Sequence, residues 1–156
     1  MSNQPSTDPS TYLEQYKAYL GDLGNVGSRY ATANGFYLSS ITALLAVLAL
    51  VKAGEALADF RPVLGVTVPV FGILLCVVWS GTLKFYNLLF LTKFTVLREL
   101  EAQGGLFPVF KRELELLQAT KMPFLIRREK FVPLLFALPF VALLCCTLLR
   151  MFKVWA

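Results

Sequence analysis

The chain has 156 residues, of which 56% are hydrophobic and 13 are Phe, and its formal net charge is +5. It has no histidine, which removes the commonest general base and the commonest metal ligand. The net charge would suit a nucleic-acid partner, but the basic residues stand between long apolar runs. Membrane topology explains that charge, so we expect a lipid bilayer around this chain and no nucleic acid.

The N-terminal part is predicted to be a short flexible segment followed by a helix. Residues 1–9 are polar and contain no Lys or Arg, so no signal peptide is expected. Thr11 and Glu14 have the spacing of a capping box, which predicts a helix over residues 10–30.

One face of this predicted helix is rich in tyrosine. Its members follow at spacings of three and four, which is the period of a helix face. They are Tyr12, Tyr16, Tyr19, Leu23, Val26 and Tyr30. Gly21, Gly24 and Gly27 oppose the helix by about 1 kcal/mol each, so it needs support from packing. These glycines follow no strand and precede no Gly-Lys-Ser/Thr, so they do not indicate a nucleotide loop.

Three runs without any charged residue predict membrane-spanning helices over residues 31–51, 62–83 and 131–149. A helix rises about 1.5 Å per residue, so about 20 residues cross the ~30 Å hydrocarbon core. Pro133 and Pro139 interrupt the third run, and each removes a backbone donor. The third run is therefore either a span or a half-inserted segment that leaves the C-terminus on the inner side.

The distribution of basic residues predicts the orientation. With three spans, eleven of the 15 Lys and Arg residues share the side of the N-terminus and of the long connection between the second and third runs. The positive-inside rule places that side in the cytoplasm. We therefore expect a multi-pass protein of the inner (cytoplasmic) membrane with a cytoplasmic N-terminus.

The long connection is predicted to be helical as well. Residues 84–103 contain neither Pro nor Gly, so the second span is expected to continue as one helix of about 40 residues until Gly104. A further helix is predicted over residues 108–120. With residues 10–30, these segments predict an all-α protein whose three spans carry a cytoplasmic helical bundle. The basic stretch before the third span offers headgroup contacts at Arg127, Arg128 and Lys130.

Small residues form two faces on the first two predicted spans. On the first span, eight small residues follow at spacings of three and four. They are Ser28, Thr32, Gly35, Ser39, Thr42, Ala46, Ala49 and Ala53. The second span has a less regular small face of Gly65, Pro69, Gly72, Cys76 and Ser80. Helices associate in lipid by close approach over small residues, so these faces predict tight packing.

Three interpretations of the small faces stay open at this stage. Spans one and two could pack on each other as a hairpin, the first span could pack against a second copy, or Ser39 and Thr42 could line a pore. Asn34 and Arg29 lie near the inner boundary of the first span. The amide of Asn34 is expected to bond a neighbouring helix or water, with a gate or ligand contact as the alternative.

Enzyme chemistry is not expected. No ionisable Asp, Glu, Lys or Arg lies inside a predicted span, and the acidic residues outside them look like surface partners of nearby Lys and Arg. The spacings of metal sites, nucleophile elbows and paired carboxylates do not occur. We therefore expect no catalytic residue, no metal and no cofactor.

Several segments resemble a family of small, mostly uncharacterised bacterial integral membrane proteins. The segments are residues 12–17, 22, 28–29, 33–38, 42–44, 72–79, 93–94 and 97–101. The layout of that family is similar to that of small two-span effectors of bacterial defence systems, which have long cytoplasmic helices. The resemblance implies a protein that oligomerises and perforates the inner membrane when triggered.

Two functional hypotheses result. The first is a homo-oligomeric, channel-like or membrane-perturbing protein, with a conflict-system effector as one such role. The second is a membrane anchor or adaptor that docks a protein partner on its cytoplasmic helices, with the tyrosine face as the docking surface.

Overall fold

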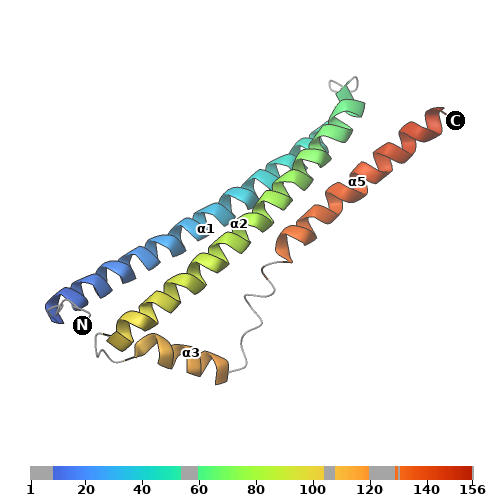
Figure 1. Cartoon of the computed structure of the whole chain (residues 1–156). Coiled ribbons are helices and arrows are strands. Elements are labelled where there is room, and N and C mark those ends of the chain that lie inside the picture. The colour runs from blue at the N-terminus through green and yellow to red at the C-terminus, as the bar shows by residue number, and fades with distance from the viewer. Residues whose placement is uncertain (1–8, 54–59, 104–107, 120–128, 130, 156) are drawn as a thin grey trace, which may run out of the picture. The chain divides into compact units, whose positions relative to one another are not determined.

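The computed structural model describes residues 9–53, 60–103, 108–119, 129 and 131–155. These residues form four long helices and no strand (Figure 1). The helices are α1 (Pro9–Ala53), α2 (Arg61–Gln103), α3 (Val109–Ala119) and α5 (Val132–Trp155). The prediction of an all-α protein is confirmed. Residues 1–8 of the segment expected to be flexible, and the headgroup candidates Arg127, Arg128 and Lys130, lie outside the described residues.

Three of the helices are long and apolar enough to cross a membrane. They contain the stretches Ser10–Leu50, Arg61–Gln103 and Val132–Phe152. Many large apolar side chains on them are exposed, among them Phe71, Leu74 and Leu135. Apolar surface of this extent is unfavourable in water and favourable in lipid. The prediction of three candidate membrane spans is therefore confirmed.

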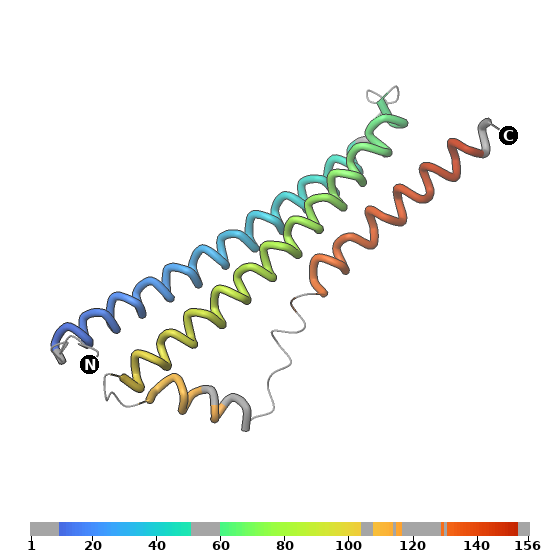
Figure 2. The backbone as a smooth tube through the Cα atoms, viewed as in Figure 1, coloured from blue at the N-terminus to red at the C-terminus, as the bar shows by residue number. Residues whose placement is uncertain are grey.

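α1 and α2 are each continuous through more than one predicted segment. α1 has 45 residues and includes both the predicted N-terminal helix and the first apolar run, with no break at Gly21, Gly24 or Gly27. α2 has 43 residues and continues past the second apolar run without interruption, as Figure 2 traces. Pro69 lies inside α2 and Pro139 inside α5, and both helices continue through them.

The chain divides into two compact units, which we describe separately. The first unit takes its described residues from Met1–Ala31 and Phe85–Leu125, so it contains the start of α1, the end of α2, and α3. The second unit takes them from Thr32–Lys84 and Ile126–Ala156, so it contains the rest of α1, the start of α2, and α5.

In the second unit, α5 packs against the small face of α2. A Cβ atom added to Gly72 would lie 2.5 Å from the ring of Phe140, and one added to Gly65 would lie 3.4 Å from Thr147. Pro69 and Phe140 are fully buried at this contact. The missing side chain of Gly72 is thus the space that the Phe140 ring fills, which lets the two helices approach closely.

α1 and α2 also pack on each other within this unit, but through larger side chains. Ile41 of α1 is fully buried, and Trp79 and Leu83 of α2 are nearly so. The predicted hairpin of spans one and two therefore forms without the small face of α1. These larger side chains provide more buried area than small residues would, and Ile41 lies on the side of α1 that faces α2.

The first unit has its own core. Val26 of α1 and Leu97 of α2 are buried in it. α3 joins this unit through the rings of Phe94 and Phe110, whose centroids lie 5.8 Å apart. Apolar packing and a few polar contacts together hold three helices.

Replacing Gly72 by alanine should loosen α5 from α2. The new methyl group overlaps the Phe140 ring, and overpacking of this kind costs about 1–3 kcal/mol. We expect Gly72→Ala to lower the thermal unfolding midpoint in detergent. Gly81→Ala is the matched control, because nothing lies within 4 Å of its added Cβ. Gly81→Ala gains the same helix propensity without a clash, so a midpoint for Gly72→Ala as high as that of Gly81→Ala would contradict the described α2–α5 contact.

Candidate functional site

The small face of α1 is open in the second unit. The residues of this face from Gly35 to Ala49 are all exposed: Gly35, Ser39, Thr42, Ala46 and Ala49. A Cβ atom added to Gly35 would meet nothing within 4 Å. The two small faces thus differ, because α5 covers Gly65 and Gly72 of α2, whereas the α1 face from Gly35 to Ala49 is exposed among the described residues of the unit.

The hydroxyl groups on this face donate to the backbone of their own helix. Ser39 Oγ donates to the carbonyl oxygen of Gly35 at 2.8 Å, and Thr42 Oγ1 donates to that of Leu38 at 2.8 Å. A hydroxyl hydrogen engaged in this way does not require a polar partner on another helix. The face is therefore uncharged, narrow and suited to close approach by another helix in lipid.

A polar and aromatic cluster connects α1 to α2 near one end of the second unit. Trp79 Nε1 donates to Asn34 Oδ1 at 2.8 Å, and the Tyr37 ring stacks on Trp79 with centroids 5.8 Å apart. Tyr37 Oη lies 2.9 Å from Thr82 Oγ1, which itself donates to the Val78 carbonyl at 3.1 Å. A threonine hydroxyl has one hydrogen, so Tyr37 is the donor in its pair with Thr82.

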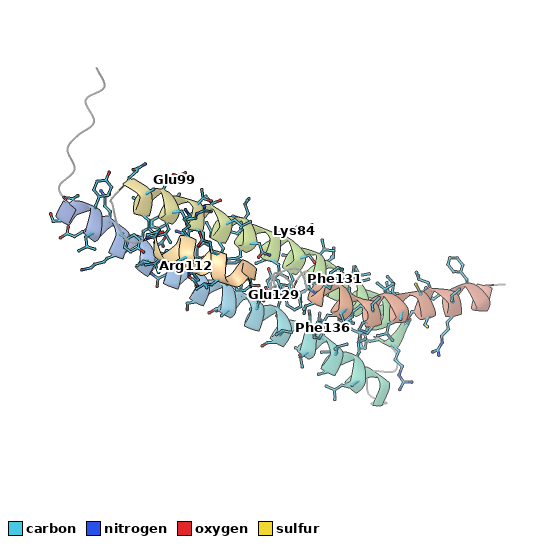
Figure 3. The ribbon with its side chains drawn as sticks, turned by 90° about the horizontal axis from the view of Figure 1, so that it is seen from below. Lys84, Glu99, Arg112, Glu129, Phe131 and Phe136 are labelled. Carbon is cyan, nitrogen blue, oxygen red and sulfur yellow. The ribbon has the colours of Figure 1, made fainter. Side chains whose placement is uncertain are left out.

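This cluster shows which partner Asn34 takes among the described residues. Of the alternatives given for its amide, the structure records the bond to a neighbouring helix. Trp79 is buried, and it also lies near Phe136 of α5, which Figure 3 labels. Arg29, the other residue predicted at this boundary, is exposed on α1 and belongs to the first unit.

Glu101 joins three helices in the first unit. Its Oε1 accepts hydrogen bonds from Tyr16 Oη of α1 at 3.2 Å and from the backbone N–H of Phe110 at 3.1 Å. Phe110 is the second residue of α3, so the carboxylate serves the unsatisfied N–H groups at that helix end. The residue is only 2% exposed, and its Oε2 has no partner among the described residues. The expectation that the acidic residues are surface partners of Lys and Arg is wrong for Glu101.

The environment of Tyr16 changes its acidity. Burial raises the pKa of the Tyr16 hydroxyl above its ordinary value of 10.0, and the nearby Glu101 carboxylate raises it further. Both effects favour the neutral phenol. Tyr16 therefore stays a hydrogen-bond donor to Glu101 throughout the neutral pH range.

Tyr19 and Tyr30 of the tyrosine face also make contacts inside the first unit. Lys93 of α2 forms an ion pair with Asp22 and lies 4.6 Å from the centroid of the Tyr19 ring. Tyr30 meets Tyr86 and Phe90 edge to face. The surface that the adaptor hypothesis would use for docking is thus engaged in contacts between α1 and α2.

Sequence reasoning missed the partners of these polar residues. Glu101 and Tyr16 are 85 positions apart, and Asn34 and Trp79 are 45 positions apart. The sequence offers no pairing signal at such separations. One weaker signal was available. The helical periodicity of α2 places Glu101 on the same side as Leu97, which is the buried side of the helix.

The fold and these surfaces define a multi-pass α-helical membrane protein whose small face on α1 is open. The family model that matches residues 13–149 agrees with this class. The chain belongs to the octameric membrane protein family, 8xMP. Membership implies a protein that associates with copies of itself in a membrane. No curated protein and no solved structure matches the chain.

The contribution of Tyr16 to stability should be lost at alkaline pH. Its pKa is raised in the folded protein, so the contribution is fully present below pH 10.0 and falls as pH rises through the folded pKa. We expect Tyr16→Phe to reduce stability by about 1 kcal/mol at pH 7. The difference in thermal midpoint between the two proteins should be constant up to about pH 10 and shrink above it. A difference that grows above pH 10 would contradict the assigned direction.

Proposed function

We propose that this chain forms a closed homo-oligomer in the bacterial inner membrane and acts as a channel-like or membrane-perturbing assembly. Eight copies is the number that the family description gives, and we propose that number here. The proposal includes no catalytic step. A role as a conflict-system effector is the finer form of this proposal, and the similarity in layout to such effectors supports it.

The observation that supports self-association most directly is the open small face of α1. Leucine-rich surfaces gain little from association in lipid, because lipid tails are equally apolar. A run of small side chains lets two backbones approach closely and gain dispersion contacts. Ser39, Thr42, Ala46 and Ala49 are exposed in the single chain, so this face is available to a second copy.

A closed ring of copies encloses a central axis, and this supports the channel-like part of the proposal. The excess of basic residues on one side supports an orientation with the first unit in the cytoplasm.

Enlarging the small face should disrupt assembly. We expect Ala46→Leu to hold two helices apart, at a cost of about 1–3 kcal/mol for each interface. Native mass spectrometry of the purified protein should then show smaller species than the wild type. Ala142→Leu is the matched control, because it makes the same change at an exposed position of α5. A variant Ala46→Leu that keeps the full assembly would rule out this face as the interface.

Liposomes distinguish the channel-like role from the adaptor role. Vesicles that contain the wild-type assembly should release a trapped dye or dissipate an ion gradient, whereas vesicles with the Ala46→Leu variant should stay tight. An adaptor would leave both kinds of vesicle tight and would copurify with a partner protein. Tight vesicles around a verified wild-type oligomer would therefore contradict the channel-like proposal.

A further inference from the structure

The outer side of α1 in the first unit contains two glycines that packing within the unit does not explain. Gly21 and Gly24 are exposed, and a Cβ atom added to either would meet nothing within 4 Å. Each costs a helix about 1 kcal/mol relative to alanine. Helical periodicity places them on the side of α1 opposite to Tyr19 and Val26, which face the interior of the unit.

The outer side of α2 in the same unit contains bulky apolar side chains. Phe85, Leu88 and Leu91 are 62%, 64% and 67% exposed. The two exposed threonines beside them, Thr92 and Thr95, donate to the carbonyl oxygens of Leu88 and Leu91 at 3.0 and 2.9 Å. This ridge, Phe85–Leu88–Leu91, therefore requires an apolar cover and no polar partner.

The bilayer alone is too thin to cover this ridge together with the second span. Between Pro62 and Thr92 the one charged residue is Lys84. A helix over that stretch of α2 is about 46 Å long, compared with about 30 Å of hydrocarbon. Part of the apolar side of α2 thus extends beyond the hydrocarbon, where contact with protein would remove it from water.

The contacts inside the unit show which residues of α1 and α2 lie at the same position along the axis of the antiparallel helix pair. Tyr16 is level with Glu101, and Asp22 is level with Lys93. By the same register, Gly21 is level with Thr95, and Gly24 is level with Leu91 and Thr92. Ser28 and Ala31, which are small and exposed on the glycine side of α1, are level with Leu88 and Phe85. A rotation about a membrane-normal axis keeps every height unchanged, so in a neighbouring copy these positions stay level.

We propose that the glycine side of α1 in one copy receives the Phe85–Leu88–Leu91 ridge of α2 in the next copy. This interface is heterologous, because two different surfaces of the same chain meet, and an interface of that kind forms a ring when the rotation between neighbouring copies closes. It pairs small residues with large ones, as helix packing requires. The inference rests on the proposed self-association and adds the second surface, which the open face of α1 does not identify by itself.

Exposed charges support a second copy as the occupant. Lys17, on the glycine side of α1, is level with Glu99 on the ridge side of α2. Both side chains are exposed, and Figure 3 labels Glu99 near the end of α2. The charges on the two sides are of opposite sign at matching heights, which favours this register over others.

Charge reversal with rescue tests the interface. Lys17→Glu or Glu99→Lys alone places like charges opposite each other. We expect each to raise the protein concentration for half-assembly at low salt by about tenfold, since every interface of the ring changes at once. The double variant K17E/E99K should assemble like the wild type. Lys111→Glu, at an exposed position of α3, is the control and should leave assembly unchanged.

Cross-linking gives a second measurement. In a variant without Cys76, Cys145 and Cys146, we introduce Lys17→Cys and Glu99→Cys and treat the assembly with a short bis-maleimide. The two positions lie on opposite outer sides of the α1–α2 pair, so a ladder of covalent oligomers is expected instead of a linked monomer.

The outcomes separate the two proposals. A wild-type protein that is monomeric by native mass spectrometry would overturn the proposed function together with this inference. A wild-type oligomer in which both single reversals assemble normally and no ladder forms would overturn the α1–α2 interface alone. That second result would assign the ridge to lipid or to another protein.

Discussion

Hydrocarbon offers no hydrogen-bond partner to a peptide group, and this constraint determines most of the structure. A backbone in lipid must satisfy its N–H and C=O groups internally, and a helix does so within one segment. Helices α2 and α5 each continue through an internal proline, because breaking the helix in lipid would expose more unsatisfied groups. The same constraint explains why Ser39 and Thr42 donate to their own backbone.

Once the helices exist, the size of their side chains decides which of them meet. In the second unit, Gly72 makes room for the Phe140 ring, and the contact between α2 and α5 depends on that absence of a side chain. The contact between α1 and α2 depends instead on large side chains, because Trp79 stacks on Tyr37 and donates a hydrogen bond to Asn34. The small residues on α1 thus stay exposed for contact with another molecule. The self-association that membership of the family implies gives a reason for such a contact.

The sequence predicts the helices well and their partners poorly, for a physical reason. Charge-free length and a period of 3.6 are local properties, so the three candidate spans and the continuous α2 can be derived without a structure. The sequence does not show which small face packs inside the chain. The answer depends on how the surfaces of different helices fit together, and a local pattern describes only one helix. Glu101 illustrates the same limit, because only its contacts with Tyr16 and Phe110 distinguish it from the exposed Glu99 two residues earlier.

The two hydrogen bonds at Glu101 end on one oxygen atom, Oε1, while Oε2 is buried without a partner among the described residues. The attachments of α1 and of α3 to the end of α2 are for this reason thermodynamically coupled. A displacement of the carboxylate therefore weakens both bonds at once, because the two donors share one acceptor atom. The position of one side chain at the end of α2 thus affects the attachment of two other helices.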